Sequence, residues 1–199
     1  DVEDFAFSSA TGLKTVTLDV DKASDPALTA TQKAPSAFGA AVTTYTGPTP
    51  ALTFSSMANL TSVTLTGFYQ SLTFTSLANL ATVDIDATTG DLTMSGNNAM
   101  TSLDVTGSEI GNVSITSNTA IATMELDHTT DLNFYGTTAD RTYVTHTITG
   151  NSELTSLTSS ADKVMTLNVS SNAKLATVNF TGLTDDGTAT TTVNPTILF

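Results

Sequence analysis

The chain has 199 residues, a formal net charge of −13 and no cysteine. No lysine or arginine occurs between Lys33 and Arg141, so nucleic-acid phosphates and anionic membrane surfaces meet no basic patch there. The lack of cysteine excludes disulfides, thiolate zinc sites and cysteine nucleophiles. No apolar run is long enough to cross a membrane. The sequence therefore predicts neither nucleic-acid binding nor direct membrane insertion.

The first predicted element is a repeat unit at residues 5–18, where apolar residues recur at intervals of 2, 3, 3, 3 and 2. Its two hydrophobic-x-hydrophobic pairs indicate β-strands that point both apolar side chains to one face. Residues 19–50 break this spacing with four of the five prolines, and they predict an insertion on one side of the fold. The apolar positions of this first unit are Phe5, Phe7, Ala10, Leu13, Val16 and Leu18.

Residues 51–126 carry the same spacing in consecutive copies of about 20–21 residues. Two short parallel β-strands are expected in each coil, with neighbouring coils about 4.8 Å apart. An isolated repeat would not fold, because stability comes from stacking. The copies are Leu52, Phe54, Met57, Leu60, Val63, Leu65; Leu72, Phe74, Leu77, Leu80, Val83, Ile85; Leu92, Met94, Asn97, Met100, Leu103, Val105; and Val113, Ile115, Asn118, Ile121, Met124, Leu126.

The rhythm fails in an irregular coil at 127–147, where residues 140–149 alternate and predict one long strand. Coils resume over 148–180, and the late copy has its apolar positions at 167, 169, 175, 178 and 180, with Asn172 between them. Residues 181–199 end on Ile197-x-Phe199 and are predicted to form a C-terminal cap or edge strand. The chain is thus predicted to be a single repeat domain over residues 1–199, an all-β-rich solenoid.

The copies at 97–126 resemble leucine-rich repeats. Met100-x-x-Leu103-x-Val105 and Ile121-x-x-Met124-x-Leu126 match the L-x-x-L-x-L core. The unit is similar to the short, roughly 21-residue type of bacterial extracellular proteins, such as internalins and Bacteroidetes surface adhesins. It departs from that type where Met57 and Leu77 replace asparagine. The resemblance implies a leucine-rich-repeat-like β-solenoid that acts in adhesion outside a bacterial cell, whereas the motif itself specifies no ligand.

The outward residues of the first strand in each coil are mostly small and hydroxylated. Such a Thr-x-Thr lattice resembles the ice-binding surface of β-solenoid antifreeze proteins, although threonine also suits any exposed strand. The predicted surface-binding residues are Thr53, Thr73, Thr75, Thr93 and Thr116.

The outward residues of the second strand are more acidic. Calcium prefers clustered carboxylate oxygens, although the regular Asp-x-Asp-x-Asp-Gly loop of a strong calcium motif is absent. A solvated acidic face and a calcium site therefore both stay open. The candidate metal ligands are Asp84, Asp86, Asp104, Glu125 and Asp127.

Nothing in the sequence predicts catalysis. His128 and His146 are the only histidines, neither is marked as a base, and no G-x-S-x-G motif occurs. The chain begins at Asp1, which is typical of a processed secreted protein or an excised fragment. We expect a non-enzymatic extracellular or cell-surface protein without a cofactor, calcium aside. Its expected partners are other proteins, itself in a head-to-tail polymer, or an ice or glycan surface.

Overall fold

The computed structural model describes residues 4–8, 10, 12–20, 51–129, 144–160, 164–181 and 196–199. These residues form β-strands and no helix, and hence none that could cross a membrane. The predicted insertion at 19–50 lies outside the described residues from position 21 onward, and residues 130–143 of the predicted irregular coil also lie outside them. The strands are β1 (Asp4–Ser8), β2 (Thr15–Val20), β3 (Ala51–Ser55), β4 (Ser62–Thr75), β5 (Thr82–Ser95), β6 (Ser102–Thr116), β7 (Thr123–Thr129), β8 (Val144–Thr149), β9 (Ser156–Ser159), β10 (Val164–Asn168), β11 (Thr177–Phe180) and β12 (Thr196–Leu198).

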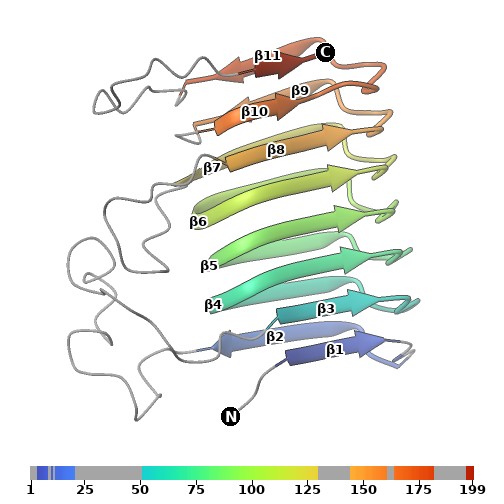
Figure 1. Cartoon of the computed structure of the whole chain (residues 1–199). Helices are drawn as coiled ribbons and strands as arrows, with labels where there is room; N and C mark the ends of the chain where they lie inside the picture. Colours follow the sequence, from blue (N-terminus) through green and yellow to red (C-terminus); the bar gives the residue numbers. More distant parts are fainter. Residues whose placement is uncertain are drawn as a thin grey trace, which may run out of the picture.

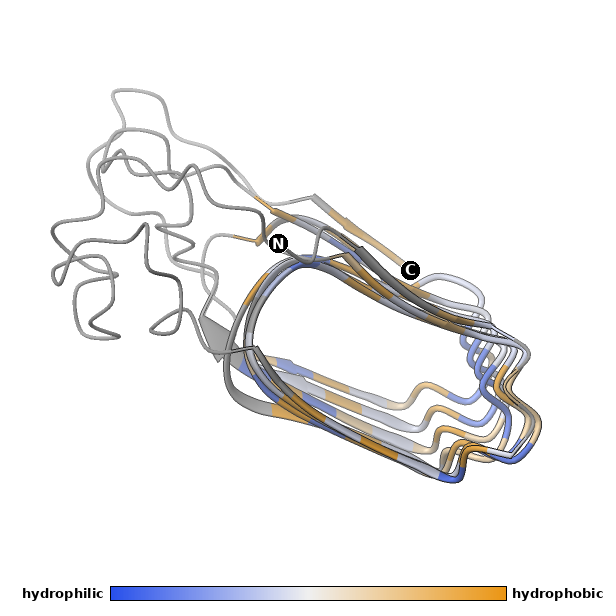
Figure 2. Cartoon of the chain, turned by 90° about the horizontal axis from the view of Figure 1, so that it is seen from below, coloured by the Kyte–Doolittle hydropathy of each residue, from blue (hydrophilic) through white to orange (hydrophobic). Residues whose placement is uncertain are grey.

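All the strand pairs are parallel, and they form two rows. The front row in Figure 1 contains the first strand of every repeat, from β1 and β3 through β8 and β10 to β12. The second row starts at β2 and ends at β11, whose arrows point the opposite way to those of β1 and β3. Seen along the stack, the repeats superpose in two layers joined by tight turns (Figure 2). The arrangement is all-β, parallel and consistent with a β-solenoid.

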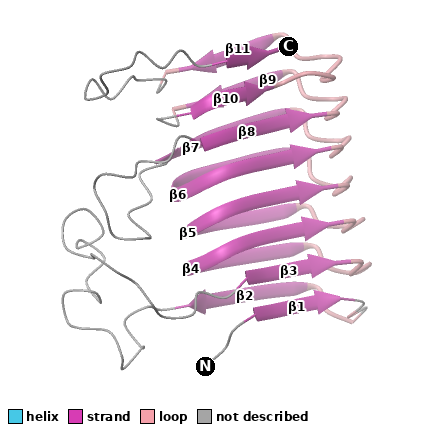
Figure 3. Ribbon diagram, in the orientation of Figure 1, coloured by secondary structure: helices cyan, strands magenta, loops and turns pink. Residues whose placement is uncertain are grey.

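Three strands are longer than the spacing predicts. β4, β5 and β6 run for 14, 14 and 15 residues, because the second strand of one repeat continues into the first strand of the next. The pairing continues through the bend, where Gly67 lies opposite Ala87 and Tyr69 opposite Thr89. Gly67 has a φ of 103°, a backbone conformation that residues with a side chain rarely adopt. Figure 3 shows these strands curving from one layer into the other.

The apolar positions of the repeat form one continuous core. In the copies at 51–126, every apolar residue of the 2-3-3-3-2 pattern is buried. Similar side chains stack on one another from repeat to repeat, as the rings of Phe7, Phe54 and Phe74 do with centroids 5.1 and 5.2 Å apart. The bend between the rows adds Tyr69, whose hydroxyl donates to the Thr66 carbonyl oxygen at 2.9 Å. The hydrophobic periodicity therefore identifies the core residues, and stacking of the repeats buries them.

Six of the described first strands are followed by a residue with left-handed backbone geometry. At this corner the chain turns from the first strand toward the second, and the next residue points into the core. Serine at such a φ carries a steric cost that glycine avoids. The corner residues are Ser56, Ser76, Gly96, Ser117, Gly150 and Ser171, with φ between 54° and 70°.

Buried asparagines follow four of these corners and form a ladder along the stack. Asn97, Asn118 and Asn151 are fully buried, and Asn172 is 8% exposed. The side-chain Oδ1 of each accepts a hydrogen bond from the backbone N–H at the same position of the preceding repeat. These bonds join the N–H of Leu77, Asn97, Asn118 and Asn151 to Asn97, Asn118, Asn151 and Asn172, at 2.9–3.1 Å.

The amide group of each ladder asparagine also donates to the preceding repeat. Asn97 Nδ2 bonds the Phe74 carbonyl oxygen at 3.0 Å, and Asn118 Nδ2 bonds that of Met94 at 3.1 Å. Asn151 Nδ2 bonds the Ile115 carbonyl oxygen at 2.9 Å. Each asparagine thus satisfies one buried donor and one buried acceptor of the preceding repeat, which an apolar side chain could not do.

We expect Asn118→Ala to lower the free energy of unfolding by about 2–4 kcal/mol, because it leaves the Asn97 N–H and the Met94 carbonyl oxygen buried without partners. Urea unfolding followed by circular dichroism measures the loss. Asn98→Ala is the matched control, since Asn98 is exposed and bonds only Thr119 in the next repeat; it should cost less than about 1 kcal/mol. Equal losses for the two variants would contradict the ladder as the main polar support.

Candidate functional site

The first strands place small polar side chains on a broad outer face, which we call the hydroxyl face. Strand pairing aligns its central column, Thr53, Thr73, Thr93, Ser114, Thr147 and Asn168. It also aligns the next column, Ser55, Thr75, Ser95, Thr116 and Thr149. The predicted surface-binding residues Thr53, Thr73, Thr75, Thr93 and Thr116 all lie in these two columns.

The side chains of the hydroxyl face shield one another. Every residue of the two aligned columns is half-buried rather than exposed. Rungs lie about 4.8 Å apart, and alternate residues along a strand lie about 6.6 Å apart. β-Branched side chains have few rotamers, and close neighbours reduce their freedom further. The face is therefore a rigid lattice of methyl and hydroxyl groups, about 24 Å tall over five steps of this spacing.

A third column borders the hydroxyl face, and the repeat pattern alone did not reveal it. Asn112 Nδ2 donates to Asp91 Oδ1 at 2.9 Å, while Asn112 Oδ1 accepts from the Thr145 N–H at 3.0 Å. These contacts fix the edge of the lattice and partly satisfy the Asp91 carboxylate. In the sequence, each residue of this column stands two positions before a residue of the central column, and this spacing could have revealed it. The column consists of Ala51, Ser71, Asp91, Asn112, Thr145 and Thr166.

The second strands carry the predicted acidic residues on the other outer face. Asp104 pairs with Glu125, and Asp84 lies on β5, the strand next to β6 in the sheet. Asp86 lies opposite Thr66, and Asp127 accepts a hydrogen bond from the Ser160 hydroxyl. All five candidate carboxylates are exposed. They are spread along the strands, and the described residues contain no group of three or more side chains suited to hold a metal. The calcium site stays a prediction.

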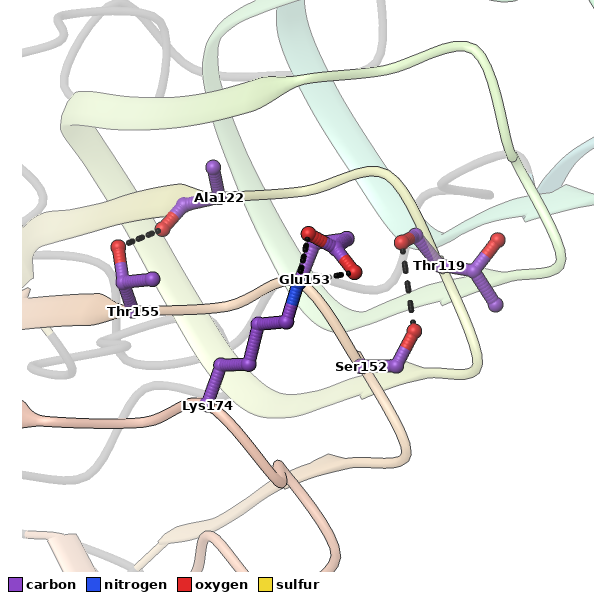
Figure 4. Close-up of polar contacts among 6 residues, drawn as sticks. All are labelled: Thr119, Ala122, Ser152, Glu153, Thr155 and Lys174. Carbon is purple, nitrogen blue, oxygen red and sulfur yellow. Dashed lines mark hydrogen bonds and ion pairs between the residues drawn. The ribbon is translucent and has the colours of Figure 1, made fainter.

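The tight turns display a third row of polar contacts on the narrow edge of the stack (Figure 4). Thr155 Oγ1 donates to the Ala122 carbonyl oxygen at 3.0 Å. Lys174 Nζ binds both carboxylate oxygens of Glu153, at 2.6 and 2.7 Å. This ion pair is about half exposed on both sides, so solvent screens it and its contribution to stability is small. These contacts join successive repeats, and the polar groups named here form hydrogen bonds or an ion pair with one another.

The two histidines lie on different strands. His146 is fully buried and occupies the first apolar position of its repeat, in register with Val113 and Leu167. The spacing His146, Ile148, Asn151, Leu154, Leu157 follows the 2-3-3-3 intervals, so the sequence contained this signal. His128 lies on β7. A core imidazole without access to solvent has no substrate to act on.

Comparison of the chain with protein-family models, with curated proteins and with solved structures found no match.

We expect Asp104→Asn to raise the melting temperature slightly, because it removes a like charge about 4.8 Å from Glu125, a repulsion of about 0.9 kcal/mol at the dielectric constant of water. Thermal melts at low and high salt measure the gain, which should shrink when salt screens the pair. Asp86→Asn is the control, since Asp86 lies opposite the neutral Thr66. A calcium-dependent rise in the wild-type melting temperature that Asp104→Asn abolishes would favour a bound ion instead.

Proposed function

We propose that this protein is a non-enzymatic β-solenoid of the short leucine-rich-repeat type, which acts as an adhesion or structural protein at a bacterial cell surface. The hydroxyl face is the contact surface. The observation that supports this proposal most directly is the register of its columns over successive repeats, with every side chain half-buried. A flat, rigid surface loses little side-chain entropy on binding.

The chemistry of the hydroxyl face fits a large partner with a regular surface. Its two aligned columns carry no charge, and threonine offers a methyl group for van der Waals contact beside a hydroxyl that both donates and accepts. Each rung contributes little, but many rungs engage at once, as repeat proteins do over extended surfaces. The five candidate carboxylates lie on the second strands, away from the hydroxyl face, and Asp91 at the edge of that face is bonded to Asn112.

We expect the combined substitution Thr73→Tyr and Thr93→Tyr to weaken adhesion by tenfold or more, because the bulky rings lift a flat partner off the lattice. Binding of the fluorescently labelled chain to intact bacterial cells and to microcrystalline cellulose measures this. Thr64→Tyr is the matched control, since Thr64 is half-buried on the outside of the second row. No saturable binding to either surface, or equal loss in the control, would refute the proposal.

Ice is a second candidate partner, favoured by the alignment of Thr73-x-Thr75 with Thr93-x-Ser95 in adjacent rungs. Evenly spaced methyl and hydroxyl groups on a rigid plane can order the water layer that meets a crystal surface. The predicted outcome is thermal hysteresis or shaping of ice crystals by the wild type, lost in the Thr73→Tyr and Thr93→Tyr variant and kept in Thr64→Tyr. Normal ice growth in the presence of the wild type would exclude ice as the partner.

A further inference from the structure

One ionisable side chain is found among the buried residues of the described part of the chain, and it lies on β8. His146 is fully buried, as are Val144 and Ile148, two positions away on either side of it. Val113 of β6 and Leu167 of β10 stand in register with it. At the same position, earlier repeats carry Leu52, Leu72 and Leu92. The imidazole therefore occupies a place that the neighbouring repeats fill with an aliphatic side chain.

The strand that buries His146 also carries part of the hydroxyl face. Thr147 lies in the central column of that face and Thr149 in the next column, and both are half-buried. Adjacent residues of a strand point to opposite faces, so His146 and Thr147 share one stretch of backbone between core and surface. β8 has six residues, whereas β5 and β6 have 14 and 15. A change at His146 therefore acts on a short strand of the hydroxyl face.

The carboxylates of the neighbouring strands give His146 no described counter-charge in the core. Three of them, on β6 and β7, are exposed on the outer face of the second row: Asp104, Glu125 and Asp127. The other ionisable residues of these two strands are Glu109 on β6 and His128 on β7. Strands β8, β9 and β10 contain no ionisable residue apart from His146. The described residues in register with the imidazole are aliphatic.

Protonation of a buried imidazole costs free energy, because the imidazolium loses its hydration and a neutral hydrogen-bond partner does not fully replace it. In the unfolded chain the ring meets water, where the pKa of a histidine is about 6.5. Below that pH the unfolded state binds more protons than the native state, so the free energy of unfolding falls as the pH falls. Exposed carboxylates keep their charge down to about pH 4. Between about pH 7.5 and 5.5 the histidines are therefore the side chains that change charge.

We propose that His146 makes β8 the acid-labile strand of the stack and thereby makes the hydroxyl face sensitive to pH. At neutral pH the uncharged ring fills its place in the core. Uptake of a proton favours states in which the ring reaches water, and β8 must leave its neighbours for this to happen. The columns of the hydroxyl face are then interrupted at Thr147 and Thr149. The acid lability stands on the burial of His146, whereas release of a bound surface in acid rests on the adhesion proposed above.

Thermal melts at about pH 7.5 and 5.5 test the role of His146, since these values lie about one unit above and below the unperturbed histidine pKa. The melting temperature of the wild type should fall by about 3–5 °C between them. His146→Leu supplies the side chain of the neighbouring repeats and should remove most of this fall, whereas His128→Gln, the matched control, should keep it. A wild-type melting temperature that stays constant or rises, or an equal fall in His146→Leu, would overturn the proposal.

Amide hydrogen exchange of the wild type locates the opening without any substitution. After correction for the intrinsic effect of pH on exchange, the protection of β8 (Val144–Thr149) should fall by about tenfold between the same two pH values. The protection of β5 (Thr82–Ser95) should change much less, because its buried side chains carry no ionisable group. Equal changes on the two strands, or no loss of protection on β8, would contradict an acid-labile β8.

Adhesion to microcrystalline cellulose and to intact bacterial cells, measured as the pH is lowered stepwise, separates this inference from the proposed function. The wild type should detach at a higher pH than His146→Leu. Detachment of both chains at the same pH would refute the link between His146 and the hydroxyl face. No binding at about pH 7.5 would refute the adhesion itself, and the melts and the exchange, which need no partner, would still decide whether β8 is acid-labile.

Discussion

The asparagine ladder is the interaction on which the regular part of this structure depends. A parallel stack buries the corner where each repeat turns, and the backbone N–H at that corner points along the stack axis toward the next repeat. In the later repeats, Asn97, Asn118, Asn151 and Asn172 supply the acceptor for this group. Their amide groups also bond a carbonyl oxygen of the preceding repeat. The same side chains thus hold adjacent repeats together and provide hydrogen-bond partners for the buried backbone groups of the corners.

The ladder also explains why the hydroxyl face is regular. Since each repeat is held at a fixed level and register by buried bonds, the outward residues of the first strands align without needing specific bonds to one another. Threonine and serine fill these positions, because they suit a strand surface. The face gains its rigidity from the core beneath it. Stacking thus creates an extended outer surface, as in other repeat folds.

The sequence by itself determined the stacked β arrangement and the apolar core. The intervals of 2, 3, 3, 3 and 2 follow directly from strand alternation and from corners of fixed length, so they were visible without coordinates. They also located Asn97 and Asn118 among apolar positions, and the column of outward threonines. Only the tertiary structure decided the rest: which groups the asparagines bond, how β4 to β6 continue around the bend, and that Asn112 joins Asp91 to the next rung. These features depend on contacts between residues at least 20 positions apart, where the backbone of one repeat meets the next.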